Sequence, residues 1–319
     1  MDSPALRQVI LNLPNQLSAD LAVLGREGLV KTDKFILCGM GGSALAGGLL
    51  RTYAPTLDLL LHRDYGLPRV PDYFLNDSLL ILSSYSGHTE EVLDTLRLAT
   101  AKGLKVAVLT SGGELLKEAE RLNLPRVVLP AGLPPRFAVG YAFVGLAQLL
   151  GHEAMLTEAR QAATLVNPVN LEAVGQGLAR SIDSKIPIIY ASTVNLALAY
   201  QWKISFNETG KIPAFANVLP EANHNELAAS DPHFIHIFLR DPADDERVKR
   251  RFEVLKEMFR AQGVTVLEVE LAGASALAKI FNAVTLASWT AYYCALAAHR
   301  DPVNVPTIEE FKARVKVTS

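Results

Sequence analysis

The 319-residue sequence has few cysteines, almost no net charge and no apolar run of membrane-spanning length. Its two cysteines, Cys38 and Cys294, lie in apolar sequence, which predicts buried, reduced thiols and no disulfide. The 31 basic and 33 acidic side chains nearly cancel, to a formal net charge of −2. This balance gives no electrostatic reason to expect a nucleic acid or an anionic membrane as partner, and a small-molecule substrate fits better.

Signals for export and membrane insertion are also lacking. Residues 1–24 show no basic stretch followed by an apolar core and a cleavage site, so we expect no secretory signal. The most apolar segment, residues 283–298, is shorter than the ~18 residues that a membrane span needs, and it contains Thr285, Ser288 and Thr290. We therefore expect a core helix there, in a protein of the reducing cytoplasm.

What the sequence does contain is an alternation of strand and helix patterns. Short β-branched runs alternate with helical patterns in two successive series, which predicts an α/β fold with two mostly parallel, doubly wound sheets flanked by helices. We place a loose boundary so that the domains are residues 1–160 and 161–319. Each half opens with a strand and a turn of small residues, a weak sign of duplication. The predicted strands are Lys34–Cys38, Leu57–His62, Leu79–Leu82, Lys105–Leu109, Arg126–Leu129, Pro187–Ala191, Phe234–Leu239 and Val264–Val269.

A glycine-rich motif follows the first predicted strand. Residues 39–43, Gly-Met-Gly-Gly-Ser, lead into a helix, so free backbone N–H groups and the Ser43 hydroxyl would lie at a helix N-terminus and favour an anion. Gly39, Gly41 and Ala44 also satisfy the dinucleotide pattern G-x-G-x-x-A. From this motif alone, a sugar-phosphate loop, a dinucleotide loop and a purely structural turn all remain open.

A second motif, residues 83–89, follows the third predicted strand and carries four aliphatic hydroxyls. A helix start needs only one capping hydroxyl. Four of them beside a glycine suit a dianionic phosphate held by neutral donors, and dinucleotide enzymes have no general need for such a loop. The motif therefore favours a sugar phosphate. The four hydroxyls are those of Ser83, Ser84, Ser86 and Thr89.

Both loops resemble those of the bifunctional phosphoglucose/phosphomannose isomerase family, which is built from sugar isomerase (SIS) domains. The resemblance extends over nearly the whole chain and implies two SIS-type domains. It departs at His88, where an asparagine is usual, but both side chains can donate a hydrogen bond. The phosphate-binding residues that the resemblance implies are Gly41, Gly42, Ser43, Ser84, Ser86 and Thr89.

Glu208 is the candidate base. Aldose–ketose isomerisation needs a group that moves a proton between C2 and C1 through an enediolate, and one carboxylate can do both. On sequence alone, a glutamate near the end of the predicted helix 196–206 is by default a solvated surface group. The family's base lies in an Asn-Glu-x-x-Lys motif, matched by Asn207, Glu208 and Lys211, so the resemblance implies that Glu208 is the base.

The resemblance implies roles for three further side chains that would otherwise be read as surface groups. His224 would assist opening of the sugar ring and reach the site from a partner subunit, which implies a homodimer. Arg136, in a proline-led loop, would stabilise the enediolate with a charge that it never loses. Lys312, near the start of the C-terminal helix, would contact the ring oxygen and hydroxyls.

Val305 departs from the family, whose dual-specific members carry a threonine there. The lost hydroxyl removes a hydrogen bond worth on the order of 1 kcal/mol, which leaves the use of mannose 6-phosphate and the efficiency of turnover open. The histidines show no spacing typical of a zinc site. Because a carboxylate and an arginine can handle an enediolate, we expect no metal and no organic cofactor.

These expectations combine into an isomerase of glycolysis and gluconeogenesis that converts glucose 6-phosphate, with mannose 6-phosphate as an open second substrate, to fructose 6-phosphate. Two alternatives remain: a sugar-phosphate sensor without turnover, and an isomerase of an amino sugar or pentose phosphate. A sensor would need an output domain, and none is visible. A glutamine-dependent amidotransferase would need a larger domain than residues 1–34 could form.

Overall fold

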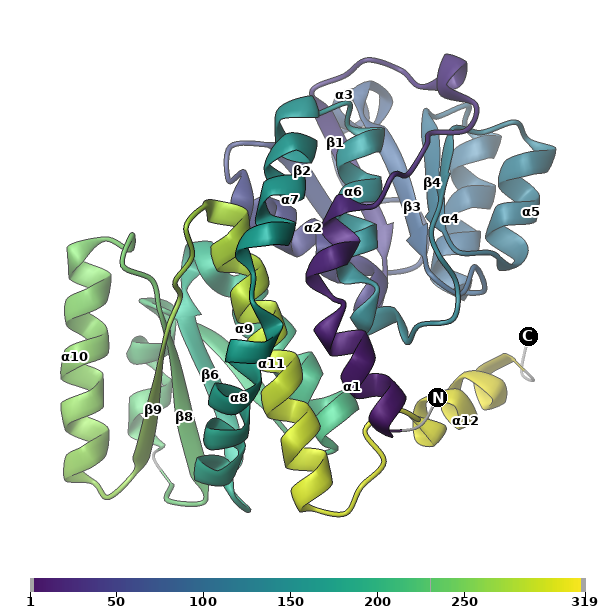
Figure 1. Cartoon of the computed structure of the whole chain (residues 1–319). Coiled ribbons are helices and arrows are strands. Elements are labelled where there is room, and N and C mark those ends of the chain that lie inside the picture. The colour runs from purple at the N-terminus through teal and green to yellow at the C-terminus, as the bar shows by residue number, and fades with distance from the viewer. Residues whose placement is uncertain (1–2, 230, 317–319) are drawn as a thin grey trace.

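The computed structural model describes residues 3–229 and 231–316, which form two parallel sheets (Figure 1). All pairings between neighbouring strands within the two sheets are parallel. The α/β class predicted from the sequence is confirmed. The first sheet has the order β2-β1-β3-β4-β5, with β1 Lys34–Gly39, β2 Asp58–His62, β3 Leu79–Ser84, β4 Val106–Thr110 and β5 Arg126–Val128. The second has the order β7-β6-β8-β9, with β6 Ile186–Ser192, β7 Phe215–Leu219, β8 Phe234–Arg240 and β9 Thr265–Glu270.

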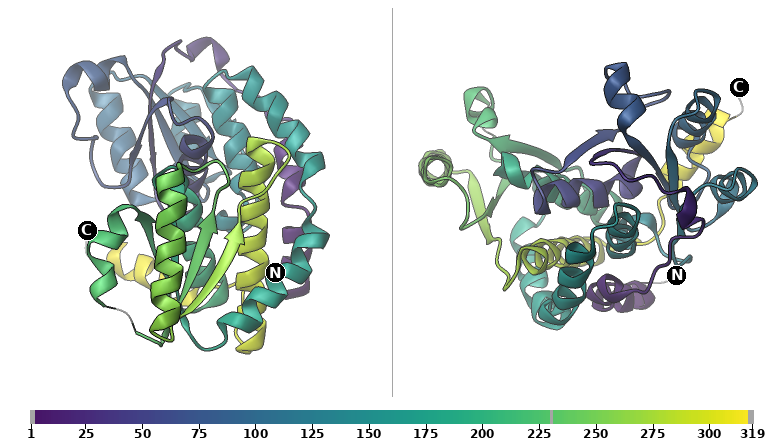
Figure 2. Two further views of the ribbon diagram at one scale, coloured as in Figure 1. Left: turned by 90° about the vertical axis from the view of Figure 1, so that its left-hand side faces the viewer. Right: turned by 90° about the horizontal axis from the view of Figure 1, so that it is seen from above.

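Helices cover both faces of the sheets because successive strand residues point to opposite sides. On β1, Ile36 belongs to the core under α4 and α5, whereas Leu37 belongs to the core shared with α2 and α6. This second core continues into the other sheet, and α10 closes the outer face of that sheet (Figures 1 and 2). The helices are α1 Ser3–Leu11, α2 Gly41–Tyr53, α3 Asp72–Asp77, α4 Glu90–Ala101, α5 Gly113–Arg121, α6 Val139–Leu149, α7 Glu153–Leu165, α8 Pro168–Ile182, α9 Leu196–Ile204, α10 Glu246–Ala261, α11 Ala276–Ala297 and α12 Pro306–Lys316.

The two sheets share a topology. The four strands of the second sheet follow the order in which β2, β1, β3 and β4 lie in the first. This agreement supports the duplication suggested by the two strand–turn motifs. The predicted domain boundary between residues 160 and 161 falls inside α7 and stays a prediction.

Eight strands lie within two residues of the predicted positions, but β7 was not predicted. β7 is an edge strand that pairs only with β6 in its sheet. Its first residue, Phe215, is more than half exposed, and the segment Phe-Ala-Asn-Val-Leu lacks a clear alternation of apolar and polar residues. Without that period, the sequence carries no strand signal.

The predicted core helix, residues 283–298, is confirmed as the larger, C-terminal part of α11, which is buried along most of its length. The hydroxyls of Ser288 and Thr290 donate to the carbonyls of Val284 and Leu286, one turn earlier, so these buried polar groups are satisfied within the helix. Among residues 3–229 and 231–316, no helix is long and apolar enough to cross a membrane.

Both cysteines are free and buried, as predicted. Burial raises the pKa of the Cys38 and Cys294 thiols to about 12, because the apolar surroundings disfavour a thiolate.

Candidate active site

The two predicted phosphate loops lie side by side at the carboxyl ends of β1 and β3. These strands are neighbours, and Gly39 is paired with Ser83. The strand order reverses here, because β2 lies on the other side of β1. In open α/β sheets, ligands bind in the crevice at such a reversal. The fold therefore brings together two motifs that are distant in the sequence.

The first loop leads into helix α2. Gly41, with a φ of 48°, begins the helix, and Gly42 and Ser43 complete its first turn. The first N–H groups of a helix have no partner within it and attract an anion. The Ser43 hydroxyl accepts a hydrogen bond of 2.9 Å from the N–H of Tyr85, which ties this loop to the second one.

The second loop is a tight turn that gathers hydroxyls. The hydroxyls of Ser84 and Thr89 lie 2.7 Å apart, and Ser84 Oγ also accepts from the N–H of Gly87 at 3.1 Å. Gly87 has a φ of 70°, and a side-chain carbon there would lie 1.8 Å from the carbonyl oxygen of Gly112. Only glycine fits this position. The exposed Ser86 lies in the same turn.

Gly42 connects the phosphate loop to Arg136. A side-chain carbon at position 42 would lie 2.9 Å from the backbone nitrogen of Arg136 and 2.9 Å from the carbonyl carbon of Pro135. Because backbone cannot move aside cheaply, glycine is what permits the 3₁₀ turn Pro135–Phe137 to rest directly on the start of α2. The loop that would hold a phosphate therefore touches the residue predicted to stabilise an enediolate.

Arg136 is 3% exposed, and each of its three guanidinium nitrogens forms a hydrogen bond or an ion pair. Nη1 lies 3.3 Å from Oε2 of Glu208, and Nε donates to the hydroxyl of Thr209 at 2.8 Å. Nη2 donates to the carbonyls of Pro302 and Val303, each at 2.9 Å. Burial lowers the pKa of Arg136, and the Glu208 carboxylate partly offsets that effect. A charge-assisted network of this kind holds the arginine in one orientation.

Glu208 lies in a π-helical turn. The sequence predicts an α-helix over residues 196–206, but α9 ends at Ile204 and continues as the π-turn Ser205–Gly210. Short π segments are rare and occur often at functional sites. The wider turn leaves the Glu208 side chain 23% exposed while it remains paired with Arg136. A carboxylate that is partly buried but still reachable is what a general base requires.

Lys211 and a C-terminal loop, residues 300–305, complete the surroundings of Glu208. Lys211 Nζ donates to the carbonyl of Glu208 at 2.6 Å and also to the carbonyl of Asn304. The pKa of Lys211 is lowered, first by burial and then by the nearby positive charge of Arg136. Val305, the predicted specificity residue, ends this loop and is partly buried. The loop is therefore held against the turn that carries the candidate base.

The structure does not bring His224 or Lys312 into contact with Glu208. His224 ends the short 3₁₀ turn Glu221–His224 and is exposed, and its side chain forms no hydrogen bond or ion pair with the described residues. Lys312 pairs with Glu309 at 2.8 Å on α12, which Figure 1 shows projecting from the body of the molecule. The phosphate loops, Arg136 and Glu208 thus form one group, and two predicted residues lie outside it.

Sequence reasoning missed two parts of this group, Thr209 and the loop of residues 300–305. Thr209 supplies the hydroxyl that accepts from Arg136 Nε, and the 300–305 loop supplies backbone carbonyls to Arg136 and Lys211. Backbone carbonyls carry no residue-type signal, so the role of that loop could not be read from side chains. Lys211 was visible as the last residue of the Asn-Glu-x-x-Lys motif.

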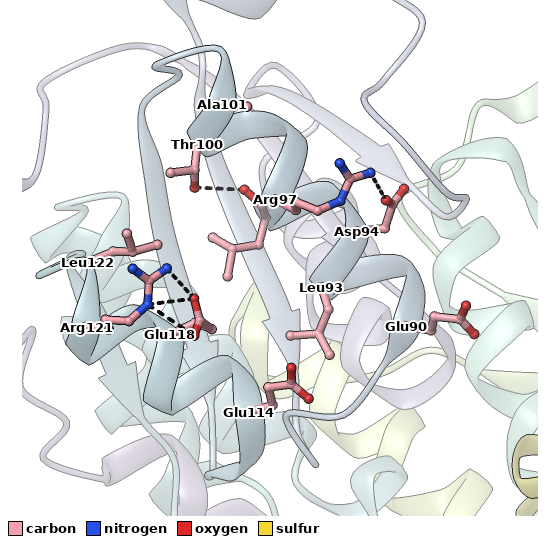
Figure 3. A pocket seen from close by; sticks show the side chains of 11 residues that line it. Glu90, Leu93, Asp94, Arg97, Thr100, Ala101, Glu114, Glu118, Arg121 and Leu122 are labelled. Atoms are coloured by element: carbon pink, nitrogen blue, oxygen red, sulfur yellow. Dashed lines mark hydrogen bonds and ion pairs between the residues drawn. The ribbon is translucent and has the colours of Figure 1, made fainter. Parts of the chain in front are cut away.

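A groove of about 640 Å³ between α4 and α5 contains none of the predicted site residues (Figure 3). Both of its arginines are already paired, because Arg97 binds Asp94 at 2.8 Å and Arg121 binds Glu118 at 2.7 Å, and the carboxylates of Glu90 and Glu114 also line the groove. The groove therefore offers no unpaired positive charge to a phosphate. Within the part of the chain that the structure describes, no group of three or more His, Cys, Asp and Glu side chains could hold a metal ion.

Comparison with known proteins identifies the family. The bifunctional phosphoglucose/phosphomannose isomerase of Aquifex aeolicus is 32% identical, over 88% of this chain and 90% of the relative. That of Caldicellulosiruptor bescii is 30% identical over 96% of this chain and 97% of the relative. The chain belongs to the bifunctional phosphoglucose/phosphomannose isomerase family. This confirms the family that the sequence motifs predicted.

Two further comparisons bear on the C-terminal domain and on the fold. Residues 172–315 match the family model described as the bacterial phospho-glucose isomerase C-terminal SIS domain. The solved structure of glucosamine-6-phosphate deaminase from Thermotoga maritima has a TM-score of 0.69 with 16% sequence identity, and the match covers 94% of this chain and 97% of that one. This likeness shows the fold alone and confirms the predicted SIS-type architecture.

Proposed function

We propose that the protein is an aldose–ketose isomerase that interconverts glucose 6-phosphate and fructose 6-phosphate, with Glu208 as the base. The observation that carries this proposal is a chain of contacts from the predicted phosphate loop through Arg136 to the Glu208 carboxylate. Gly42 lies against the backbone of Arg136, and the Arg136 guanidinium lies 3.3 Å from Glu208. A phosphate held at the ends of β1 and β3 would place the sugar carbons beside the carboxylate. The activity named for the relatives supports the same reaction.

The proposed chemistry is a proton transfer between two carbons. The Glu208 carboxylate takes the C2 proton of the open-chain aldose, the C1–C2 double bond forms, and the carbonyl oxygen at C1 takes up the negative charge. The proton of the C2 hydroxyl passes to the C1 oxygen, and return of the first proton to C1 with formation of the C2 carbonyl gives the ketose. Arg136, buried and oriented by its hydrogen bonds, stabilises the charge on the enediolate more strongly than a solvated cation would.

We also propose a homodimer in which His224 acts across the interface. Its support is that His224 is exposed and lacks a partner among the described residues of its own chain. Lys312, on the exposed face of α12, would contact the sugar in the assembled site in the same way. The free, buried thiols of Cys38 and Cys294 support a reducing compartment, so we place the enzyme in the cytoplasm, in glycolysis or gluconeogenesis.

The test is incubation of the purified protein with fructose 6-phosphate, with glucose 6-phosphate and mannose 6-phosphate followed separately. Glucose 6-phosphate should form. Binding of fructose 6-phosphate without turnover would favour the sugar-phosphate sensor and contradict the proposal. Val305→Thr, assayed in parallel, should raise the share of mannose 6-phosphate, because it restores the hydroxyl of the dual-specific relatives.

A further inference from the structure

Lys211 occupies an unusual backbone conformation immediately after the π-turn. Its φ is 58°, in the left-handed region that residues with side chains rarely adopt. A strained residue of this kind persists only where the surrounding contacts hold it. Here the contact is the side chain itself, which folds back to donate to the carbonyl of Glu208 at 2.6 Å.

This hydrogen bond satisfies a helix end. The last carbonyls of a helix lack partners within it. The backbone N–H of Ile212 donates to the carbonyl of Phe206 and not to that of Glu208. The Lys211 ammonium donates to the Glu208 carbonyl, and its positive charge interacts favourably with the negative end of the helix dipole. Lys211 therefore fixes the backbone of Glu208, and Arg136 holds its carboxylate.

The same ammonium also donates to the carbonyl of Asn304, in the loop that ends at Val305. Further hydrogen bonds hold this loop. Arg300 donates to the Lys211 carbonyl, Asp301 accepts from the N–H of Val303 at 2.8 Å, and Arg136 donates to the Pro302 and Val303 carbonyls. Lys211 and Arg136 thus both bind backbone carbonyls of the loop and both contact Glu208.

We propose that Lys211 is a positioning residue that fixes Glu208 for proton transfer by joining the π-turn to the loop of residues 300–305. The inference rests on the proposed isomerase function and adds a role for a side chain that does not itself touch the reacting carbons. Loss of the ammonium leaves two carbonyls without a donor and releases the turn. A displacement of the base by about 1 Å can cost about 100-fold in rate. Phosphate binding, at the ends of β1 and β3, stays intact.

The experiment measures kcat and KM for fructose 6-phosphate in Lys211→Met and Lys211→Arg, with thermal unfolding of each variant. Lys211→Met should lower kcat 10- to 100-fold and change KM less than threefold. Arginine can donate to two carbonyls, so Lys211→Arg should keep kcat within fivefold of wild type. Lys117→Met, at an exposed lysine of α5, is the matched control and should change neither constant.

Each outcome decides between roles. A kcat of Lys211→Met within twofold of wild type would overturn the inference. Equal losses of kcat in the Met and Arg variants would show that Lys211 acts in proton transfer and would overturn the positioning role. If Lys211→Met does not fold, Lys211→Gln takes its place under the same criteria. A wild-type protein without turnover would contradict the proposed function itself, which separates that failure from a failure confined to Lys211.

Discussion

Arg136 is a cation removed from water and compensated on every side. Its three nitrogens bind Glu208, Thr209 and the carbonyls of Pro302 and Val303. A buried charge costs several kcal/mol unless it is paired and hydrogen-bonded, so this set of partners is what makes its position tenable. In the proposed mechanism, burial of Arg136 would strengthen its interaction with an enediolate, because charges interact more strongly away from water.

Arg136→Lys tests that geometry. Lysine keeps the charge but its compact ammonium cannot reproduce the planar fork that reaches several acceptors at once. We expect kcat to fall at least 100-fold and the melting temperature to fall as well, measured by steady-state kinetics and thermal unfolding. Arg97→Lys, at an exposed arginine paired with Asp94, is the control and should be neutral. A kcat within tenfold of wild type would argue against a role of the fork.

His236 offers a second prediction at the residue scale, this time on stability. It is buried in the second sheet between the rings of Tyr190 and Phe259, and burial lowers its pKa to about 4, because the surroundings disfavour imidazolium. The unfolded chain binds a proton near pH 6.5, so stability is present above that pH and is lost as the pH falls toward 4.

Urea unfolding of wild type and His236→Phe at pH 7 and pH 5 measures this effect. The free energy of unfolding of the wild type should fall by about 2 kcal/mol more than that of the variant. Phenylalanine keeps the stacking but cannot bind a proton. Parallel losses in the two proteins would show that His236 does not titrate between these pH values.

At the scale of elements, the π-turn and the segment around His224 differ in how they are held. The π-turn is fixed by charged side chains, whereas the segment after Pro220 is anchored by Glu226 in the 3₁₀ turn Glu226–Ala228. Glu226 accepts from the hydroxyl of Tyr190 on β6 and from the amide of Asn217 on β7. One carboxylate thus ties this exposed segment to two strands.

Glu226→Ala should therefore disturb His224 without touching Glu208. We expect kcat to fall about tenfold, because the segment that presents His224 loses its anchor. Glu221→Ala, at an exposed glutamate bonded only to Asn225 among the described residues, is the control and should stay near wild type. Steady-state assays of both variants give the answer. Equal activity of the two variants would mean that the anchor does not matter for turnover.

The sequence predicts those elements whose contacts are made by recognisable residue types, and it does not predict those that depend on contacts with distant segments. The two predicted phosphate loops could be located in the sequence because glycines at positions 41, 42 and 87 and clustered hydroxyls are residue-type signals, and their binding of phosphate stays a prediction. The π-turn could not be predicted, because residues 196–206 have the composition of an ordinary helix, and the distant side chain that contacts the turn, Arg136, lies in another part of the sequence. Strand β7 was not predicted for a related reason. Its pairing with β6, and not the pattern of its own residues, makes it a strand.

At the scale of the whole molecule, one core joins two sheets of the same topology, but the predicted catalytic set is divided. The phosphate loops, Arg136 and Glu208 form one group, and His224 lies apart from it on an exposed turn. A symmetric dimer would solve this division if the same surface of each copy supplied His224 to the other.

Mixed dimers test that arrangement. Glu208→Gln and His224→Asn, each inactive alone, should recover about a quarter of wild-type activity when the two chains are unfolded and refolded together. Half of the dimers are then mixed and each has one intact site. Sedimentation would show whether dimers form. No gain of activity in a mixed dimer would place His224 in the site of its own chain and contradict the proposed exchange across the interface.

The central claim is that Glu208 carries the proton between C2 and C1. Its most direct test is the incorporation of solvent deuterium into fructose 6-phosphate, followed by NMR in D2O with wild type and Glu208→Gln. The wild type should introduce deuterium at C1, because a proton held by a carboxylate exchanges with solvent before it is returned. Glu208→Gln should introduce none above the uncatalysed background while still binding fructose 6-phosphate. Incorporation at the wild-type rate by the glutamine variant would contradict the assignment of the base.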